Sequence, residues 1–132
     1  MAKHKMNEEE WWCLPGGGIA EGEEPAQAAL RELREECCVE GKIIAEVSHI
    51  TYPPESEAYT YLVDIGNQEP QMGIDPEFNS PILVDIAWLN LKEIPERDRA
   101  FLWWSGLLSL PEFFSEVEKW GNDRSYPHNY EI

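Results

Sequence analysis

The stretch from Pro15 to Val39 constrains the fold of this chain more than any other part of it. A proline and three glycines (Gly16 to Gly18) follow a short apolar run, Trp11 to Leu14, which indicates a strand that enters a loop. From Pro25 the pattern becomes helical, because proline suits a first helical position and apolar residues then recur at spacings of three and four. The sequence therefore predicts a strand, a glycine-rich loop and a helix that ends near Cys38.

The predicted helix has a second, acidic face. Glu32, Glu35 and Glu36 lie at positions i, i+3 and i+4, so they share one side of the helix within about one turn. Three like charges this close repel one another, and a hard divalent cation such as Mg²⁺, which prefers oxygen ligands, would relieve that repulsion. The alternative is a solvated acidic face without a metal, since helix surfaces are rich in glutamate.

The rest of the chain alternates between strand-like and helix-like segments. Lys42 to Tyr52 is rich in isoleucine and valine and is predicted to be a strand that Pro53 and Pro54 end. The other predicted elements are a strand antiparallel to it at 58–65, a loop at 66–81, a third strand at 82–89 and helical segments at 94–110 and 111–120. Mixed strands with a central helix and C-terminal helices indicate an α+β domain, in which helices pack on a sheet.

Length, charge and cysteine content narrow the class of protein. A chain of 132 residues fits one domain, and its net charge of −16, from 10 Lys+Arg and 26 Asp+Glu, would repel a nucleic acid backbone. No apolar run approaches the roughly 20 residues that cross a bilayer, and the polar N-terminus carries no signal peptide. We therefore expect a cytoplasmic protein with neither nucleic acid nor membrane as partner. Three cysteines, two of them adjacent, form neither a disulfide framework nor a zinc motif, so we expect reduced thiols.

Taken together, the loop and the helix resemble the Nudix box, written G-x5-E-x7-R-E-U-x-E-E-x-G-U with U a bulky aliphatic residue. Gly17, Glu23 and the run Arg31-Glu32-Leu33-Arg34-Glu35-Glu36-Cys37-Cys38-Val39 match eight of its nine specified positions at the right spacing. The preceding Trp12-Cys13-Leu14-Pro15-Gly16-Gly17 is similar to the W-x-L-P-G-G segment common in the family. The departure is Cys38, which stands where the family usually has a glycine in the left-handed conformation that costs other residues roughly 1 kcal/mol.

The resemblance implies a fold and a metal site. The fold is an α/β/α sandwich with a mixed sheet, which we assign to residues 1–120, followed by a polar tail at 121–132. By analogy, Glu35 and Glu36 are the main ligands of Mg²⁺, with Mn²⁺ as an alternative, and Glu32 binds it directly or through water. These three glutamates are the expected catalytic and metal-binding residues.

Other residues of the box are expected to support this site. Glu23 is similar to the box residue that holds the loop, through a pair with Arg31, although it can equally be a negative charge at the positive end of the helix dipole. Gly16, Gly17 and Gly18 let the backbone turn tightly beside the metal and the phosphates of a substrate.

A further carboxylate from a later loop serves many members of the family as base or ligand. Glu77, within Asp75-Pro76-Glu77-Phe78, is our first candidate for this role, and Glu57, after the two prolines, is its rival. The alternative is that both are ordinary loop acids.

The function implied is hydrolysis of a pyrophosphate bond in a nucleoside diphosphate linked to another group, by a water that the metal activates. Nucleoside triphosphates, ADP-ribose or nucleotide sugars, and dinucleoside polyphosphates all remain candidate substrates. The first rival is a Nudix-fold sensor that binds a nucleotide without turnover, and the second is an acidic interaction protein without a small-molecule site.

The N-terminus carries one more expectation. Sixteen residues precede Gly17, whereas family members usually have a longer segment there with a strand or two. We expect the sheet to lack its N-terminal strand and to leave an unpaired edge, which invites pairing with a second copy as a homodimer.

Overall fold

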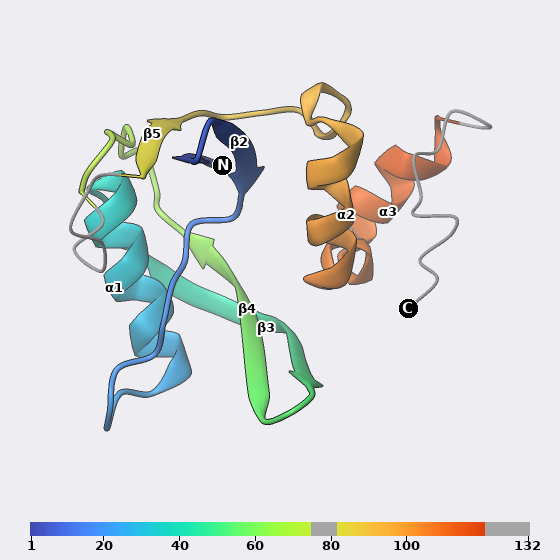
Figure 1. Ribbon diagram of the computed structural model, residues 1–132. Coiled ribbons are helices and arrows are strands. Elements are labelled where there is room, and N and C mark those ends of the chain that lie inside the picture. Colours follow the sequence, from blue (N-terminus) through green and yellow to red (C-terminus); the bar gives the residue numbers. More distant parts are fainter. Residues whose placement is uncertain (75–81, 121–132) are drawn as a thin grey trace.

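The computed structural model describes residues 1–74 and 82–120, which form an α+β arrangement of helices and strands (Figure 1). The strands are β1 (Ala2–Met6), β2 (Glu9–Cys13), β3 (Lys42–Tyr52), β4 (Ser56–Asp64) and β5 (Leu83–Ile86). The helices are α1 (Pro25–Cys37), α2 (Glu96–Trp104) and α3 (Pro111–Glu118), with the 3-10 turns η1 (Leu91–Glu93) and η2 (Leu107–Ser109). The predicted α+β class is confirmed.

Strand β1, which the sequence did not predict, is the middle strand of a three-stranded sheet in the order β2-β1-β5. Ala2 and His4 are buried, whereas Lys5 is exposed, so the strand alternates between an inner and an outer face. Because the inner positions hold a small residue and a histidine, the stretch lacks the β-branched and aromatic residues that mark a strand. Asn7 and Glu8, with φ of 52° and 67°, turn the chain into β2 through a tight hairpin.

The strands of the described residues form two separate antiparallel sheets, where we had expected one mixed sheet. In one sheet β1 pairs with β2 and β5, and in the other β3 pairs with β4. The short connections after β1 and β3 explain why β1–β2 and β3–β4 are antiparallel pairs, because a short hairpin turn permits only antiparallel neighbours whereas parallel strands need a long crossover. The N-terminal residues thus contribute a strand, and β2 and β5 are the edges of its sheet.

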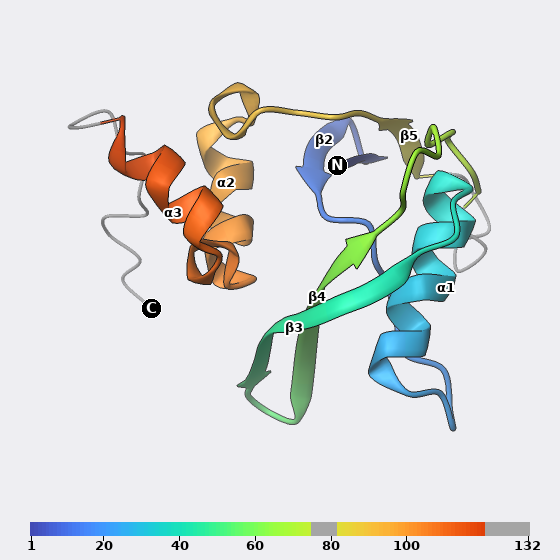
Figure 2. The same cartoon turned by 180° about the vertical axis from the view of Figure 1, so that it is seen from behind.

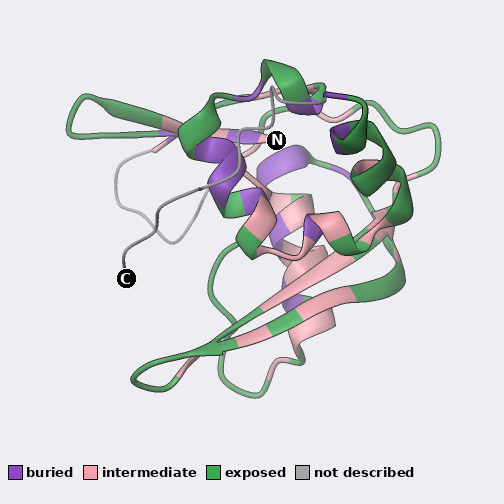
Figure 3. Ribbon diagram, turned by 90° about the vertical axis from the view of Figure 1, so that its right-hand side faces the viewer, coloured by how far each residue is buried: buried purple, intermediate pink, exposed green. Residues whose placement is uncertain are grey.

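The β3–β4 hairpin is a long ribbon that runs from the pair Lys42 and Asp64 to the pair Tyr52 and Ser56. The predicted strand 42–52 is confirmed, and its antiparallel partner begins two residues earlier than the predicted 58. Figure 3 shows this ribbon as exposed or half-buried along its length, whereas the buried segments gather on the helices and the N-terminal sheet.

The main cluster of buried apolar side chains lies among the C-terminal helices and turns, and comprises Leu91, Ile94, Leu102, Leu107, Val117 and Trp120. The predicted helical segment 94–110 is divided there into α2 and η2 by Gly106, which has a φ of 78°. A Cβ at this glycine would lie 2.8 Å from Cβ of Ser48. The neighbouring Ser105 accepts a hydrogen bond of 2.8 Å from the Ser48 hydroxyl, which ties the end of α2 to β3.

Helix α1 and the α2–α3 pair lie on opposite sides of the N-terminal sheet (Figures 1 and 2). The backbone N–H of Trp12 donates to the buried Asp98 of α2 at 2.9 Å, which fixes that pair against β2. Within residues 1–74 and 82–120, no helix combines the length and the apolar character that crossing a membrane requires.

Candidate active site

Helix α1 begins at Pro25, as predicted, and turns two of its glutamates into the protein. Glu32 and Glu36 are 1% and 0% exposed, whereas the side chain of Glu35 is 27% exposed. The acidic side of the helix is therefore not simply a solvated face. Because a buried carboxylate is costly unless other groups compensate its charge, the contacts of these residues reveal what the site is built to hold.

Glu32 lies against the glycine-rich loop. A Cβ built on Gly17 would fall 2.4 Å from Oε1 of Glu32 and 2.6 Å from its carboxyl carbon. Any side chain at position 17 would thus displace the carboxylate, which gives a structural reason for glycine at the first position of the box. The loop backbone and the carboxylate can lie side by side only because this Cβ is missing.

Glu36 is enclosed by the loop and by β1. The backbone N–H of Gly16 donates to its Oε2 at 3.3 Å, and Nε2 of His4 lies 4.0 Å from its Oε1. His4, which the sequence had placed in no motif, is thus a neighbour of the site. It is brought there by the inner face of β1, whose existence the sequence did not reveal.

Cys13 lies beside His4. Its Sγ lies 3.2 Å from Nδ1 of His4, whose ring also stacks on Trp11 at 5.9 Å between centroids. Burial, followed by the negative charge of Glu36, raises the pKa of the Cys13 thiol to about 12. The sulfur therefore keeps its proton near neutral pH and is not a nucleophile. Cys37 and Cys38 are free thiols too, the first buried and the second exposed.

Arg31 is the hub that connects the loop to the acidic face. Its Nε and Nη2 donate to the two carboxylate oxygens of Glu23 at 2.9 and 3.1 Å, and Nη2 also donates to the carbonyl of Gly18 at 2.8 Å. Its Nη1 donates to Glu32 Oε1 and to Glu35 Oε2, each at 3.1 Å. The planar guanidinium suits this forked arrangement, which lysine cannot reproduce.

The contact between Arg31 and Glu23 shifts the pKa of both side chains. Hydrogen bonding to Glu23 raises the pKa of Arg31, and the same contact lowers the pKa of the Glu23 carboxyl. Glu23 also accepts a hydrogen bond of 3.0 Å from the N–H of Ala20. The structure thus places Glu23 on Arg31 and on the loop backbone, the first of the two arrangements that the sequence left open.

The C-terminal end of α1 is held by residues 71–74, which the sequence indicated only as loop. The N–H groups of Gln71, Gly73 and Ile74 donate to the carbonyls of Cys37, Glu36 and Glu35 at 2.9, 2.8 and 3.1 Å. These are carbonyls that a helix end leaves without intrahelical partners. A Cβ on Gly73 would lie 1.8 Å from the carbonyl oxygen of Glu35, so this approach requires glycine.

Cys38 ends the helix in the conformation that the box normally gives to glycine. Its φ and ψ are 56° and 36°, in the left-handed region, and its N–H donates to the carbonyl of Arg34 at 3.0 Å. The substitution therefore leaves the helix-end geometry intact, at the steric cost of a Cβ. Arg34 is exposed, with Nε 3.9 Å from Glu40.

The donor set of the acidic face fits a hard divalent cation, because it consists of carboxylate oxygens beside a backbone that only glycine permits. However, no three His, Cys, Asp or Glu residues of the described ranges are arranged to hold a metal ion. Arg31 Nη1 instead engages Glu32 and Glu35. Binding a cation with these carboxylates therefore requires a rearrangement, for which Glu35, the least buried of the three, has the most room.

The candidates for an additional carboxylate differ in position. Glu77 lies outside the described residues. Glu57 lies on the hairpin, where its Oε1 is 3.2 Å from Nε2 of His49 and its Oε2 accepts a hydrogen bond of 3.3 Å from the hydroxyl of Tyr59. The ring of His49 stacks on Tyr59 at 4.1 Å.

A cavity of about 950 Å³ joins the glycine-rich loop and α1 to the inner side of the hairpin. Its lining includes Gly16 to Gly18 and Glu32 on one side and the β4 residues Tyr59 and Tyr61 on the other. A smaller cavity of about 490 Å³ at the hairpin tip is lined by residues 51–57 and does not reach the box. The larger cavity is the one beside the glycine-rich loop and Glu32, and its volume suits a nucleotide-sized ligand.

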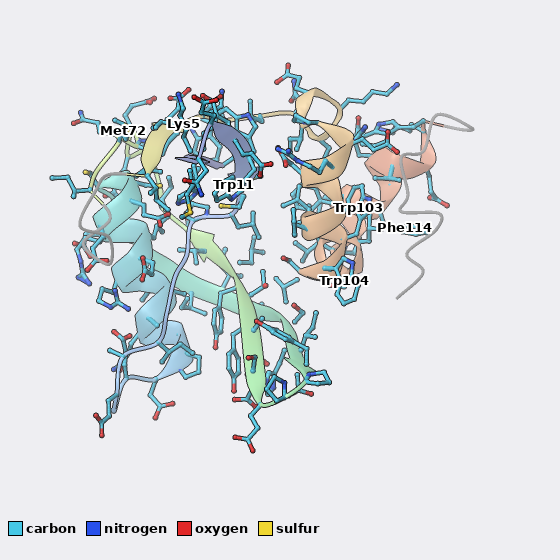
Figure 4. All side chains as sticks on the ribbon, in the orientation of Figure 1. Lys5, Trp11, Met72, Trp103, Trp104 and Phe114 are labelled. Carbon is cyan, nitrogen blue, oxygen red and sulfur yellow. The ribbon has the colours of Figure 1, made fainter. Side chains whose placement is uncertain are left out.

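Several aromatic residues lie away from this cavity. Figure 4 shows Trp103, Trp104 and Phe114 on α2 and α3, at the end of the molecule opposite Met72. Trp103 packs against the C-terminal core cluster. The aromatic residues that line the cavity are Tyr52, Tyr59, Tyr61 and Trp88.

Comparison with known proteins identifies the family. The sequence profile of the NUDIX domain matches residues 1–105, most of this chain, and the chain belongs to the Nudix family. No solved structure gives a significant match.

Curated relatives resemble this chain over part of their length. It is 29% identical over 86 residues to a nucleoside triphosphate pyrophosphatase/Nudix hydrolase fusion protein of Bifidobacterium longum, a match that covers 65% of this chain and 17% of that protein. It is 52% identical over 48 residues to the chloroplastic Nudix hydrolase 26 of Arabidopsis thaliana, covering 33% and 22%. It is 38% identical over 56 residues to the human diphosphoinositol polyphosphate phosphohydrolase 3-alpha, covering 41% and 34%. The chain thus spans no more than about a third of each of these relatives.

Proposed function

We propose that this chain is a divalent-cation-dependent pyrophosphohydrolase, which cleaves the phosphate–phosphate bond of a nucleoside diphosphate linked to another group. The observation that carries the proposal is the position of Glu32, which lies against Gly17 at the wall of a cavity of about 950 Å³. Glu36 accepts a hydrogen bond from Gly16, and Glu35 is linked to the same loop through Arg31. Membership of the Nudix family supports the same reaction class.

The roles follow from burial and contacts. Glu32, Glu35 and Glu36 would hold the cation, which we propose to be Mg²⁺ with Mn²⁺ as an alternative, because both accept carboxylate oxygens. When bound, the cation supplies charge neutralisation at the diphosphate and makes a water more acidic. We propose that the backbone of Gly16 to Gly18 approaches the phosphates of the substrate. Arg31 and Glu23 hold the loop on the helix.

The chemical step requires a base and a leaving group. The oxygen of a water forms a bond to one phosphorus, the bond from that phosphorus to the bridging oxygen breaks, and the other phosphate leaves with that oxygen. We propose that a loop carboxylate accepts the proton of the water, with Glu77 as the first candidate and Glu57 as its rival.

We also propose a substrate class, a cellular location and an oligomeric state. We expect a small-molecule nucleotide as substrate, a cytoplasmic location, and a homodimer formed through a strand edge such as that of β5. Light scattering tests the last point, because a clean monomer at high protein concentration would contradict it.

The test is hydrolysis with product analysis by mass. The protein is incubated with Mg²⁺ and a panel of nucleoside triphosphates, ADP-ribose, nucleotide sugars and dinucleoside polyphosphates. We expect Glu35→Gln to lose most of the activity, because it removes a ligand charge at nearly constant shape. Glu40→Gln is the matched control, since Glu40 is an exposed glutamate just beyond the same helix. Equal activity of both variants would contradict the assignment of the site.

One observation favours a second candidate, a nucleotide sensor without turnover. Arg31 Nη1 engages Glu32 and Glu35, so these carboxylates are not arranged as a metal site in this conformation. A sensor would bind a nucleotide in calorimetry and release no product over long incubation, whereas the enzyme would release product.

A further inference from the structure

The cavity beside the box has an unusual charge for a site that takes a phosphorylated ligand. Its described lining includes four glutamates, namely Glu32, Glu55, Glu57 and Glu69. No lysine, arginine or histidine side chain belongs to that described lining. The amino group of Met1, which also lies there, donates to the carbonyl of Ala87 at 2.8 Å, and burial lowers its pKa.

Arg31, the residue before Glu32, does not supply the missing positive charge. Arg31 reaches the carbonyl of Gly18, yet three carboxylates surround its guanidinium within 3.1 Å, those of Glu23, Glu32 and Glu35. The cluster as a whole is therefore negative. Even with a divalent cation bound, these side chains would leave little positive charge to attract a third phosphate group of a substrate.

The hairpin wall of the cavity is rich in aromatic side chains, and its charged residues, Glu55 and Glu57, are both negative. Tyr59 and Tyr61 on β4 both have a raised pKa, caused first by burial and then by Glu57 and Glu46 respectively, so their hydroxyls stay protonated at neutral pH. Tyr52 and Trp88 add aromatic surface at the opening, where they are 49% and 76% exposed. Aromatic faces attract flat neutral groups and cations, and they offer nothing to a phosphate.

From this charge pattern we propose that the substrate is a diphosphate esterified at both ends, whose second group carries no negative charge. The inference rests on the proposed function and narrows its substrate class. Such a diester carries about two fewer negative charges than a nucleoside triphosphate, so it meets less repulsion from the cavity glutamates. A diphosphoinositol polyphosphate, with still more phosphates, is disfavoured further. A neutral or cationic second group lies against the tyrosines and near Glu55 and Glu57.

The experiment compares ADP-ribose with ATP, two substrates that share one nucleoside and differ in charge. Without divalent cation at low salt, where ATP keeps its full charge, we expect calorimetry to show about tenfold tighter binding of ADP-ribose than of ATP, and the ratio to shrink near 0.15 M salt as screening sets in. A double variant, Glu55→Gln with Glu69→Gln, should tighten the binding of ATP by several-fold more than that of ADP-ribose. Glu112→Gln on α3, an exposed glutamate outside the cavity lining, should change neither value.

The outcomes separate this inference from the proposed function. Tighter binding of ATP at low salt, or an equal response of both compounds to the double variant, would overturn the charge selection, while hydrolysis of either compound with Mg²⁺ would still uphold the proposed function. If neither compound is cleaved, the proposed function fails, and the same binding measurements decide the inference. Tighter binding of ADP-ribose, by a ratio that the double variant reduces, would then sustain it.

Discussion

The box region and the β3–β4 hairpin face each other across one cavity but are built in different ways. In the box, Arg31 alone makes five hydrogen bonds, and the loop, the helix and residues 71–74 are tied together by backbone contacts. The hairpin is mostly exposed or half-buried, and its polar contacts are largely local, such as those among His49, Glu57 and Tyr59.

This contrast in burial and contacts predicts where each part of the proposed function resides. A dense, buried network holds charged groups in place, as catalysis requires, and it tolerates little change. An exposed ribbon can vary its side chains at small cost to the fold, so it can change which ligand is accepted. We therefore assign the chemistry to the box and recognition of the substrate's second group to the hairpin.

The largest expected effect comes from Gly73→Ala. The added Cβ would lie 1.8 Å from the carbonyl oxygen of Glu35, which forces the 71–74 segment off the end of α1. We expect a loss of unfolding free energy of about 3 kcal/mol or more, together with loss of activity. Gly66→Ala is the control in urea denaturation, because Gly66 has a φ of 60° with open space around it and should cost only about 1 kcal/mol. Equal costs would show that the segment does not hold the helix.

Arg31→Lys should have the next largest effect. Lysine keeps the charge but cannot bridge Glu23, Gly18 and the two box carboxylates at once. We expect kcat/KM to fall by about tenfold or more, because the loop is no longer held on the helix. Arg34→Lys, on the exposed side of the same helix, serves as the control and should leave kcat/KM unchanged. A fully active Arg31→Lys enzyme would contradict the role of the network.

Cys38→Gly is expected to have a smaller effect, in the stabilising direction. Glycine adopts the observed φ of 56° without the steric cost of a Cβ, so the free energy of unfolding should rise by about 1 kcal/mol. Cys38→Ala keeps the Cβ and should give no such gain. If both variants have the same stability in denaturant titration, the thiol rather than the backbone conformation decides this position.

The box region could be predicted from the sequence because its signals are local. Pro25, the glycine run and the spacing of Glu32, Glu35 and Glu36 fix a loop and a helix within a short segment, and the structure has both. Burial of Glu32 and Glu36 was not predicted, since helical spacing shows which residues share a face but not what covers that face.

The residues that the sequence missed depend on contacts between distant parts of the chain. His4 reaches Glu36 because β1 pairs between β2 and β5, and no local pattern around His4 indicates such a strand. Likewise, Gly73 meets the end of α1 from a segment that resembles any other loop. A glycine in a loop indicates a turn in the sequence, whereas the close approach of Gly73 to Glu35 is seen only in the structure.

The most direct test of the division between box and hairpin is a steady-state comparison of Glu35→Gln with Tyr59→Leu on one substrate that the wild type cleaves. We expect Glu35→Gln to lower kcat by about a hundredfold with little change in KM, because it removes a ligand of the cation that would activate the water. Tyr59→Leu removes an aromatic wall of the cavity and should raise KM about threefold to tenfold with kcat nearly unchanged. If Tyr59→Leu lowers kcat as strongly as Glu35→Gln, or if Glu35→Gln changes KM alone, the assignment of chemistry to the box and recognition to the hairpin is wrong.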